Sequence, residues 1–330
     1  MRRRDIVLLA GAALALPRAG AAQQSERVRH IGYLTPATGS PEDALGVAQT
    51  RGLVEGLREL GWFDGRNISI EHRYSGSGRE KIRANAKELV TLHPDVIFCV
   101  GGPTLVALLA ETRTIPIVFI NVNDPVGAGY VASLAQPGGN ATGIAVSEAP
   151  LAAKWLQLLK EAAPEITRVL VLPEADAAAQ RLMADTIAAA APALGLTLTT
   201  FYIREPNDYD REIEAFAREA GGGMVPLSSP TFANNQPKVY GLAVKYRLPA
   251  IYSYPAYARA GGLISYGPDT AAIAREATRY IDKILRGATP ADLPVQQPSR
   301  FVLAVNLKTA KAIGLTVPPS ILARADEVIE

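Results

Sequence analysis

Asp124 is the residue of this sequence best placed to pair with a cationic group. It follows the apolar run Ile115–Ile120, which is typical of a buried strand, and it precedes Pro125. A carboxylate at the end of a central strand can bind an ammonium group, which needs a partner once it leaves water. Asp124 can equally cap a turn and a short helix that begins at Val126. Both roles stay open from the sequence, and one residue can fill both.

Similar polar or aromatic loops follow other apolar runs of the chain. They are TPATGS from Thr35, GGPT from Gly101, NVNDP from Asn121, PEAD from Pro173, SSPTFANN from Ser228 and YSYPAY from Tyr252. Parallel sheets bind ligands outside the carboxyl ends of their strands, so two facing sheets would bring these loops into one cleft. The predicted ligand-binding residues are Thr35, Gly102, Pro103, Thr104, Asn123, Asp124, Glu174, Ser228, Ser229, Tyr252, Tyr254 and Tyr266. No loop places a nucleophile beside a base, which favours a binding site over an enzyme.

Donors for a ligand carboxylate are available without lysine or arginine. Backbone N–H groups and hydroxyls of Gly102, Thr104, Ser228 and Ser229 can supply them. A zwitterionic amino acid would therefore find both a carboxylate partner and neutral donors in these loops.

Four tyrosines gather near one another in the sequence: Tyr252, Tyr254, Tyr257 and Tyr266. One interpretation is packing at a hinge between two lobes, since buried tyrosine is common where one end of the ring meets water. The other is that one or two of these rings stack on an apolar or aromatic ligand.

Metal and hydrolytic sites are not indicated. His30, His72 and His93 have no metal-ligand spacing to one another or to Cys99, which lies in an apolar run and is expected in the core. The sequence has no G-x-S-x-G elbow and no Walker A motif, and GGPT lacks the lysine of a P-loop. We expect no cofactor.

GAGYVA, from Gly127 to Ala132, fits the dinucleotide pattern G-x-G-x-x-A, with Glu148 at a suitable distance. However, that fingerprint needs a full helix whose N-terminus binds the pyrophosphate. Pro137 and Gly138 would end such a helix after about two turns. Nicotinamide binding is therefore disfavoured.

The body of the chain alternates strands and helices. Strands are expected at 30–34, 68–72, 95–100, 115–120, 142–146, 168–172, 196–202, 223–227, 248–253 and 300–305, with helices between them and at 271–285. Apolar strands separated by helices predict parallel sheets covered on both faces. The pattern restarts at Arg168, which favours two similar α/β halves, and the segments after 267 are interpreted as returns between them. We expect lobe 1 at 28–146 plus about 267–290 and lobe 2 at 147–262 plus about 291–330.

The N-terminus is typical of an export signal. MRRRD precedes an 11-residue apolar stretch and the small residues Ala19–Ala21, so we expect residues 1–21 to be a signal peptide cleaved near Ala21. The apolar stretch is too short to span a bilayer. A buried N-terminal helix is the alternative, and Arg3-Arg4 permits twin-arginine as well as general export. The formal net charge of the whole chain is +2, and the expected signal peptide contributes +3. The rest of the chain therefore has a charge of about −1, which gives no electrostatic reason to bind nucleic acid or an anionic membrane.

Three longer stretches carry a family resemblance: TIPIVFINVNDPVGAGYVASLAQPGGNATG, YRLPAIYSYPAYARAGGLISYG and the segment from ILRGATP to the end of the chain. With the export signal they resemble the substrate-binding proteins of ABC transporters, in the group related to tryptophan- and tyrosine-binding members. The resemblance covers essentially the whole mature chain. It implies two Rossmann-like lobes joined by a three-strand hinge (the type I periplasmic-binding fold), with an amino acid or aromatic amino-acid-like ligand between the lobes.

The resemblance also implies a monomeric periplasmic protein that works with an ABC permease and an ATPase. Three loops differ from the usual family pattern: LPEADA with Glu174, Pro255-Ala256-Tyr257 near the hinge, and Ser229-Pro230. All three should face the ligand. The alternative functions are a ligand sensor that feeds a receptor and, less well supported, a nicotinamide-dependent enzyme.

Overall fold

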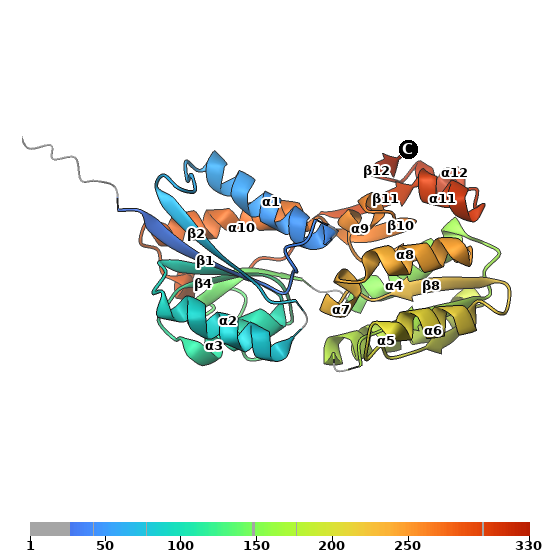
Figure 1. Ribbon diagram of the computed structural model, residues 1–330, viewed down its shortest axis with the longest axis horizontal. Helices are drawn as coiled ribbons and strands as arrows, with labels where there is room; N and C mark the ends of the chain where they lie inside the picture. Colours follow the sequence, from blue (N-terminus) through green and yellow to red (C-terminus); the bar gives the residue numbers. More distant parts are fainter. Residues whose placement is uncertain (1–26, 42, 77, 147–148, 176, 299) are drawn as a thin grey trace, which may run out of the picture.

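The computed structural model describes residues 27–41, 43–76, 78–146, 149–175, 177–298 and 300–330. Two α/β lobes lie side by side along the long axis of the molecule (Figure 1). The expected signal peptide lies outside the described residues.

The first lobe is built on one parallel sheet. Its strands are β1 (Arg29–Thr35), β2 (Ile68–Tyr74), β3 (Val96–Val100), β4 (Ile117–Asn123) and β5 (Ala141–Val146), in the order β2-β1-β3-β4-β5. Every residue of β3 and β5 is buried, because helices cover both faces of the sheet.

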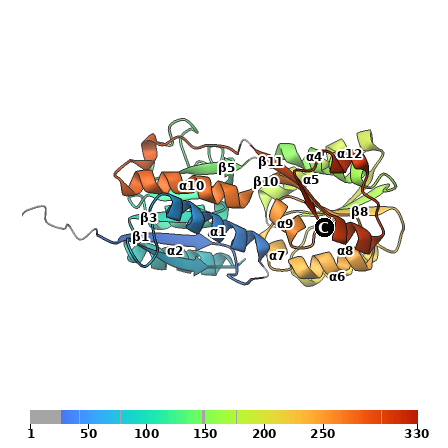
Figure 2. The ribbon, with the colours of Figure 1, turned by 90° about the horizontal axis from the view of Figure 1, so that it is seen from above.

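Successive strand residues alternate between two cores. Tyr33 packs with α1 (Ala44–Glu59) and α10 (Thr270–Leu285) on one face. Leu34 packs with α2 (Arg79–Thr91) and α3 (Gly102–Glu111) on the other. Helix α10 comes from the C-terminal third of the chain, and both ribbon views show it beside α1 (Figures 1 and 2).

The contact between α1 and α10 depends on two glycines. A Cβ atom added to Gly52 would lie 2.1 Å from the carbonyl oxygen of Ala271, and one added to Gly56 would lie 2.7 Å from Oγ1 of Thr278. These helices can therefore approach closely only because both positions lack a side chain.

The second lobe contains two groups of strands. β6 (Arg168–Leu172), β7 (Thr197–Thr200) and β8 (Gly222–Pro226) are parallel in the order β7-β6-β8. β9 (Ile251–Tyr252), β10 (Ile264–Pro268), β11 (Phe301–Asn306) and β12 (Glu327–Ile329) have the order β12-β11-β10-β9, with only β10 and β11 antiparallel among them. A bridge between Met224 and Ala250 joins the two groups.

Helices cover both faces of this lobe as well. One core includes residues of α4 (Ala149–Ala162), α5 (Ala178–Ala190), α11 (Leu307–Ile313) and α12 (Pro319–Leu322). The other includes residues of α6 (Asn207–Phe216), α7 (Pro230–Ala233), α8 (Gln236–Lys245) and α9 (Pro255–Arg259). Short 3-10 helices lie at Pro192–Leu194 and Pro290–Asp292.

The described elements change lobe at three points of the sequence: between β5 and α4, between β10 and α10, and ahead of β11. Thr142 Oγ1 donates a hydrogen bond to the carbonyl oxygen of Leu293 at 2.6 Å, and the Gln296 amide donates one to that of Gly143 at 3.0 Å. Residues 293–296 therefore contact the first sheet, whereas our predicted limits assign them to the second lobe. The other domain limits stay a prediction.

The structure differs from the expected elements at two places. The segment after β4 forms turns instead of the expected short helix. Pro125 restricts the backbone there, and Gly129 has φ +73°, outside the helical region. The C-terminal strand β12 was not expected, because only three residues pair.

Candidate functional site

A cavity of about 240 Å³, called the inner cavity below, lies between the two lobes. Its first-lobe lining is Pro36, Ala37, Asp43, Leu45, Gly46, Gln49, Val100, Gly101, Gly102, Pro103, Asn121 and Asn123. Its second-lobe lining is Glu174, Ala177, Ala179, Gln180, Met183, Ser228, Ser229, Pro230, Ala233 and Tyr254. Loops at the carboxyl ends of β1, β3, β4, β6, β8 and β9 supply much of this lining, as expected for parallel sheets.

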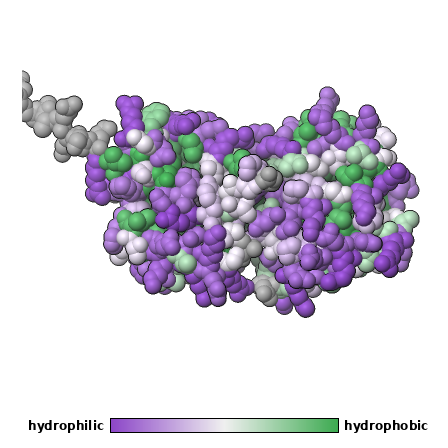
Figure 3. All heavy atoms as spheres, in the orientation of Figure 1, coloured by the Kyte–Doolittle hydropathy of each residue, from purple (hydrophilic) through white to green (hydrophobic). Residues whose placement is uncertain are grey.

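In the space-filling view, the surface between the lobes is paler than much of the purple, hydrophilic surface of the outer parts (Figure 3).

Asp43 shapes the loop between β1 and α1. Its Oδ1 accepts a hydrogen bond from the Gly46 amide at 2.9 Å, and its Oδ2 accepts one from the Thr38 amide at 3.0 Å. Burial raises the pKa of the Asp43 carboxyl, and these two amide donors partly oppose the rise. Thr35 supports the same loop, since its hydroxyl oxygen accepts a hydrogen bond from the Ala37 amide at 3.2 Å. Thr35 does not line the cavity.

Thr104 supports the loop between β3 and α3. Its side chain is fully buried and its Oγ1 donates to the carbonyl oxygens of Val100 and Gly101, at 2.7 and 2.8 Å. Gly101, with φ +85°, allows the sharp entry into α3, and Gly102 and Pro103 then face the cavity.

Asn121 lines the inner cavity, although it was not predicted from the sequence as a ligand contact. It has φ +55° and lies where the pairing of β4 and β5 shifts register between Ile120 and Val122. Its Oδ1 is buried, and within the described part of the chain it has no hydrogen-bond partner. An unsatisfied acceptor in a cavity is costly unless a ligand or water supplies a donor. The only signal in the sequence is that asparagine tolerates positive φ at the end of an apolar strand.

Asp124 does not line the inner cavity. Its Oδ1 accepts a hydrogen bond from the Gly127 amide at 2.9 Å, in a turn whose φ at Asp124 is +40°. A Cβ atom at Gly127 would lie 2.0 Å from Oδ2 of Asp124, so the turn also requires glycine there. The structure thus shows the turn contact. The ammonium-binding role predicted for Asp124 is untested, and it competes with the role that we propose below for Glu174.

Glu174 lines the inner cavity from the loop after β6. Its Oε1 accepts a hydrogen bond from the Thr231 hydroxyl. Gln180 fixes the same loop: its Oε1 accepts from the Glu174 amide at 2.6 Å, and its Nε2 donates to the Ser228 carbonyl oxygen at 2.7 Å. Gln180 was not expected from the sequence, because it lies inside an alanine-rich helix.

The two predicted serines also line the inner cavity. Ser228 Oγ lies 2.7 Å from the hydroxyl oxygen of Tyr257. Ser229 caps α7, since its Oγ accepts from the Phe232 amide at 3.0 Å. Both hydroxyls therefore have protein contacts before any ligand is considered.

The tyrosines divide between core and cavity. Tyr252 and Tyr257 are buried with Phe232 in an aromatic cluster, and Tyr252 does not line the inner cavity. Tyr254 lines it, with its ring edge-on to Tyr257 at a centroid distance of 5.7 Å. Tyr266 packs beside Phe301 on the strands next to the crossings and lies outside the cavity lining.

A second space, called the outer cavity below, has a volume of about 660 Å³. Its lining is Arg79, Ile82, Arg83, Gly102, Pro103, Val106, Ala107, Ala110, Glu111, Asn121, Asn123, Tyr130, Ala177 and Ala179. Burial raises the pKa of the Tyr130 phenol, so this hydroxyl is neutral at physiological pH.

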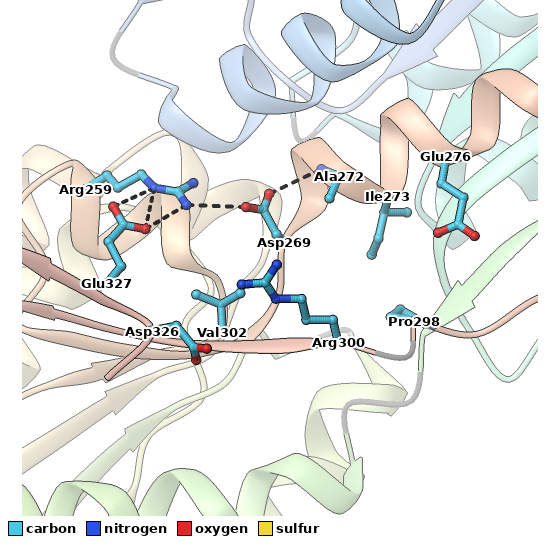
Figure 4. Close-up of a pocket in the computed structure, with 10 residues that line it drawn as sticks. All are labelled: Arg259, Asp269, Ala272, Ile273, Glu276, Pro298, Arg300, Val302, Asp326 and Glu327. Carbon is cyan, nitrogen blue, oxygen red and sulfur yellow. Dashed lines mark hydrogen bonds and ion pairs between the residues drawn. The ribbon is translucent and has the colours of Figure 1, made fainter. Parts of the chain in front are cut away.

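A third cavity, of about 200 Å³, lies beside the crossings (Figure 4). There Arg259 of α9 donates to both carboxylate oxygens of Glu327, at 2.8–3.0 Å, and to Asp269 at 3.3 Å. Asp269 also caps α10 through the amides of Ala271 and Ala272. The cluster thus connects the second lobe to the helix that packs on the first.

The comparisons with known proteins agree with this architecture. The pattern of the family described as "ABC transporter substrate binding protein" matches residues 42–329. The chain belongs to this family. The family consists of solute-binding proteins without enzymatic activity, which confirms the expectation of a binding protein. Membership also implies a small-molecule ligand and transporter partners.

Three proteins that are similar to this chain are informative. A "Tyrosine-binding protein" of Clostridioides difficile (strain R20291) is 24% identical over 265 residues, which cover 80% of this chain and 76% of that protein. An ABC domain from Streptococcus pneumoniae in complex with L-Trp is 26% identical, with a TM-score of 0.80, and covers 92% of this chain and 100% of its own. A conserved domain protein from Vibrio cholerae is 27% identical, with a TM-score of 0.82 and the same coverage. The expected type I periplasmic-binding fold is confirmed.

The chain superposes less well on an open relative than on the L-Trp complex. A ligand-free, open substrate-binding protein from Clostridium difficile is 25% identical and covers 92% of this chain, but its TM-score is 0.65.

No helix in the described ranges is long and apolar enough to cross a membrane. Among the same residues, no group of three or more His, Cys, Asp or Glu side chains could hold a metal ion.

Proposed function

We propose that this protein is the periplasmic solute-binding component of an ABC importer, and that it binds an amino acid or an aromatic amino-acid-like compound in the inner cavity. The observation that carries the proposal is a cavity lined by both lobes, with the buried acceptor Asn121 Oδ1 that suits a cationic donor. A ligand that contacts both lobes favours the closed arrangement, which is the state that a transporter can recognise.

Glu174 is our proposed partner for the ligand ammonium. It is the second-lobe carboxylate of the inner cavity, and its loop is held in place by Gln180. Asp43 is the first-lobe carboxylate, but both of its oxygens already accept backbone hydrogen bonds. Asn121 Oδ1 offers a further acceptor from the opposite lobe.

The remaining contacts follow from the lining of the inner cavity. We propose that Gly102, Pro103, Asn123, Ser228, Ser229 and Tyr254 contact the ligand. Thr35, Thr104, Tyr252 and Tyr266 then support the loops and strands that carry these residues.

The test is mass spectrometry of small molecules released from freshly purified, denatured protein, followed by calorimetric titration of what is found. Release of an amino acid or a related compound that rebinds supports the proposal. A retained nicotinamide nucleotide, or turnover of a bound compound, would contradict it.

The proposed partners are one ABC permease and one ATPase, and the proposed form is a monomer exported with cleavage near Ala21. Intact-mass measurement on a periplasmic extract tests the export, and a mature chain that begins at or near Ala22 is expected. Full-length protein confined to the cytoplasm would contradict it.

A further inference from the structure

The inner and outer cavities adjoin each other. The residues that line both are Gly102, Pro103, Asn121, Asn123, Ala177 and Ala179. The inner cavity alone is smaller than the roughly 300–1,000 Å³ usual for ligand sites, whereas the outer cavity falls inside that range. A ligand that stays in the inner cavity would leave most of this space unused.

The charges differ between the two cavities. Among the residues that the structure describes, the charged ones that line the inner cavity are Asp43 and Glu174, both acidic. Those that line the outer cavity are Arg79, Arg83 and Glu111. The space therefore changes from negative to positive on going from the inner to the outer cavity.

Arg79 and Arg83 are placed to act together. They lie one turn apart on the same face of α2. Within the described ranges neither forms an ion pair with an aspartate or a glutamate, although many other arginines of the chain do. A guanidinium group is the side chain best suited to bind a carboxylate through two hydrogen bonds.

Apolar side chains also line the outer cavity. They include Ile82, Val106, Ala107 and Ala110, and Val106 leaves 46% of its surface exposed. Asn121 lies at the junction, with its buried Oδ1 still without a partner in the described chain. Among the described residues, the inner cavity thus offers a carboxylate, the outer cavity offers apolar side chains and a guanidinium pair, and the Asn121 amide is shared by both.

We propose that the outer cavity is a subsite for a ligand carboxylate that is separated from the ligand ammonium by a longer spacer than the single carbon of a free α-amino acid. In a free α-amino acid the two charged groups share one carbon, so it cannot place one in each cavity. A dipeptide with an aromatic first residue can. This inference rests on the proposed function and narrows its ligand class to amino-acid derivatives with a remote carboxylate.

The test uses calorimetric titration with three probes: L-tyrosine, L-tyrosyl-L-alanine and the C-terminal amide of that dipeptide. The protein variants are the parent, Arg79→Gln/Arg83→Gln and the control Lys81→Gln/Lys87→Gln. The control removes two positive charges from exposed positions of the same helix that do not line the outer cavity. A melting curve for each variant checks that the fold is kept.

We expect the parent to bind the dipeptide at least tenfold more tightly than its amide and more tightly than L-tyrosine. The arginine variant should bind dipeptide and amide equally, while the lysine control keeps the preference. The inference is overturned if the parent binds dipeptide and amide equally, or if the arginine variant keeps the preference for the dipeptide. In either case, binding of L-tyrosine still supports the proposed function. Failure of all three probes to bind would overturn both.

Discussion

Arg259 and Asp269 form an ion pair at 3.3 Å between the two lobes. Arg259 ends α9 of the second lobe, whereas Asp269 caps α10, which packs on the sheet of the first lobe. Glu327 fixes the same guanidinium from within the second lobe. A contact of this kind can bias the angle between the lobes without touching the ligand.

We expect Asp269→Asn to weaken ligand binding about two- to fivefold. Asparagine keeps the cap of α10 but loses the charge, and a partly exposed ion pair contributes roughly 0.2–1 kcal/mol. The measurement is calorimetry beside a melting curve, with Glu161→Gln as the control, because Glu161 pairs with Arg324 inside the second lobe. Equal loss of affinity in both variants would show that the Arg259–Asp269 pair has no special effect on closure.

Gly52→Ala should destabilise the first lobe by about 1–3 kcal/mol. The added methyl group would meet the Ala271 carbonyl at 2.1 Å, so α1 and α10 must separate. Gly241→Ala is the matched control, since Gly241 is also inside a helix, is exposed and has no atom within 4 Å of an added Cβ. Urea unfolding should show a loss for Gly52→Ala and a gain of up to about 1 kcal/mol for Gly241→Ala. The same small effect at both positions would argue against the tight helix contact.

The free energy of unfolding should fall as the pH drops below about 6.5, the usual value for histidine. Burial lowers the pKa of His72, whose ring stacks on Tyr74 and meets Tyr33 edge-on. The unfolded chain then binds a proton at a higher pH than the folded chain, so the stability is full above the unfolded pKa and is lost as the pH falls through the folded pKa. Asp43, whose pKa is raised, acts in the opposite direction at lower pH.

Urea unfolding at pH 7.5 and pH 5.5 measures this effect in the parent and in His72→Gln. The pH difference should shrink in His72→Gln and stay in His30→Gln, since His30 is exposed on β1. A pH difference that is the same in all three proteins would rule out His72 as its source.

Tyr254→Leu should weaken binding of L-tryptophan more than binding of L-alanine. Tyr254 brings an aromatic ring to the inner cavity, and such a ring adds about 0.5–1.5 kcal/mol when it meets another. Calorimetry with both amino acids measures the difference, and Tyr266→Leu is the control outside the cavity lining. If both amino acids lose affinity equally in Tyr254→Leu, the ring serves packing alone.

The apolar strands made the fold predictable from the sequence. Runs such as Val96–Val100 and Ile117–Ile120 are buried on both faces, and only a parallel sheet covered by helices accommodates them. The return of the chain to the first lobe at α10 was also predictable from the sequence. The packing of α10 against α1 was not. The close contact depends on Gly52, which in sequence is only a glycine inside a helical pattern.

The site was less predictable because loop backbones decide it. Loop position alone correctly brought Gly102, Asn123, Glu174 and Ser228 to one cavity. It could not show that Thr104 turns its hydroxyl to the backbone, or that the register shift after Ile120 brings Asn121 into the lining. Asp124 and Glu174 look equivalent in sequence, yet the structure places only Glu174 in the inner cavity.

The central claim is that an amino-acid-like ligand binds in the inner cavity with its ammonium on Glu174. Its most direct test is calorimetric titration of L-tyrosine and L-tryptophan into the parent, Glu174→Gln and Asp124→Asn. We predict binding by the parent, a loss of about 2–5 kcal/mol in Glu174→Gln, and near-parental affinity in Asp124→Asn. Parental affinity in Glu174→Gln, or a large loss in Asp124→Asn alone, would contradict this account.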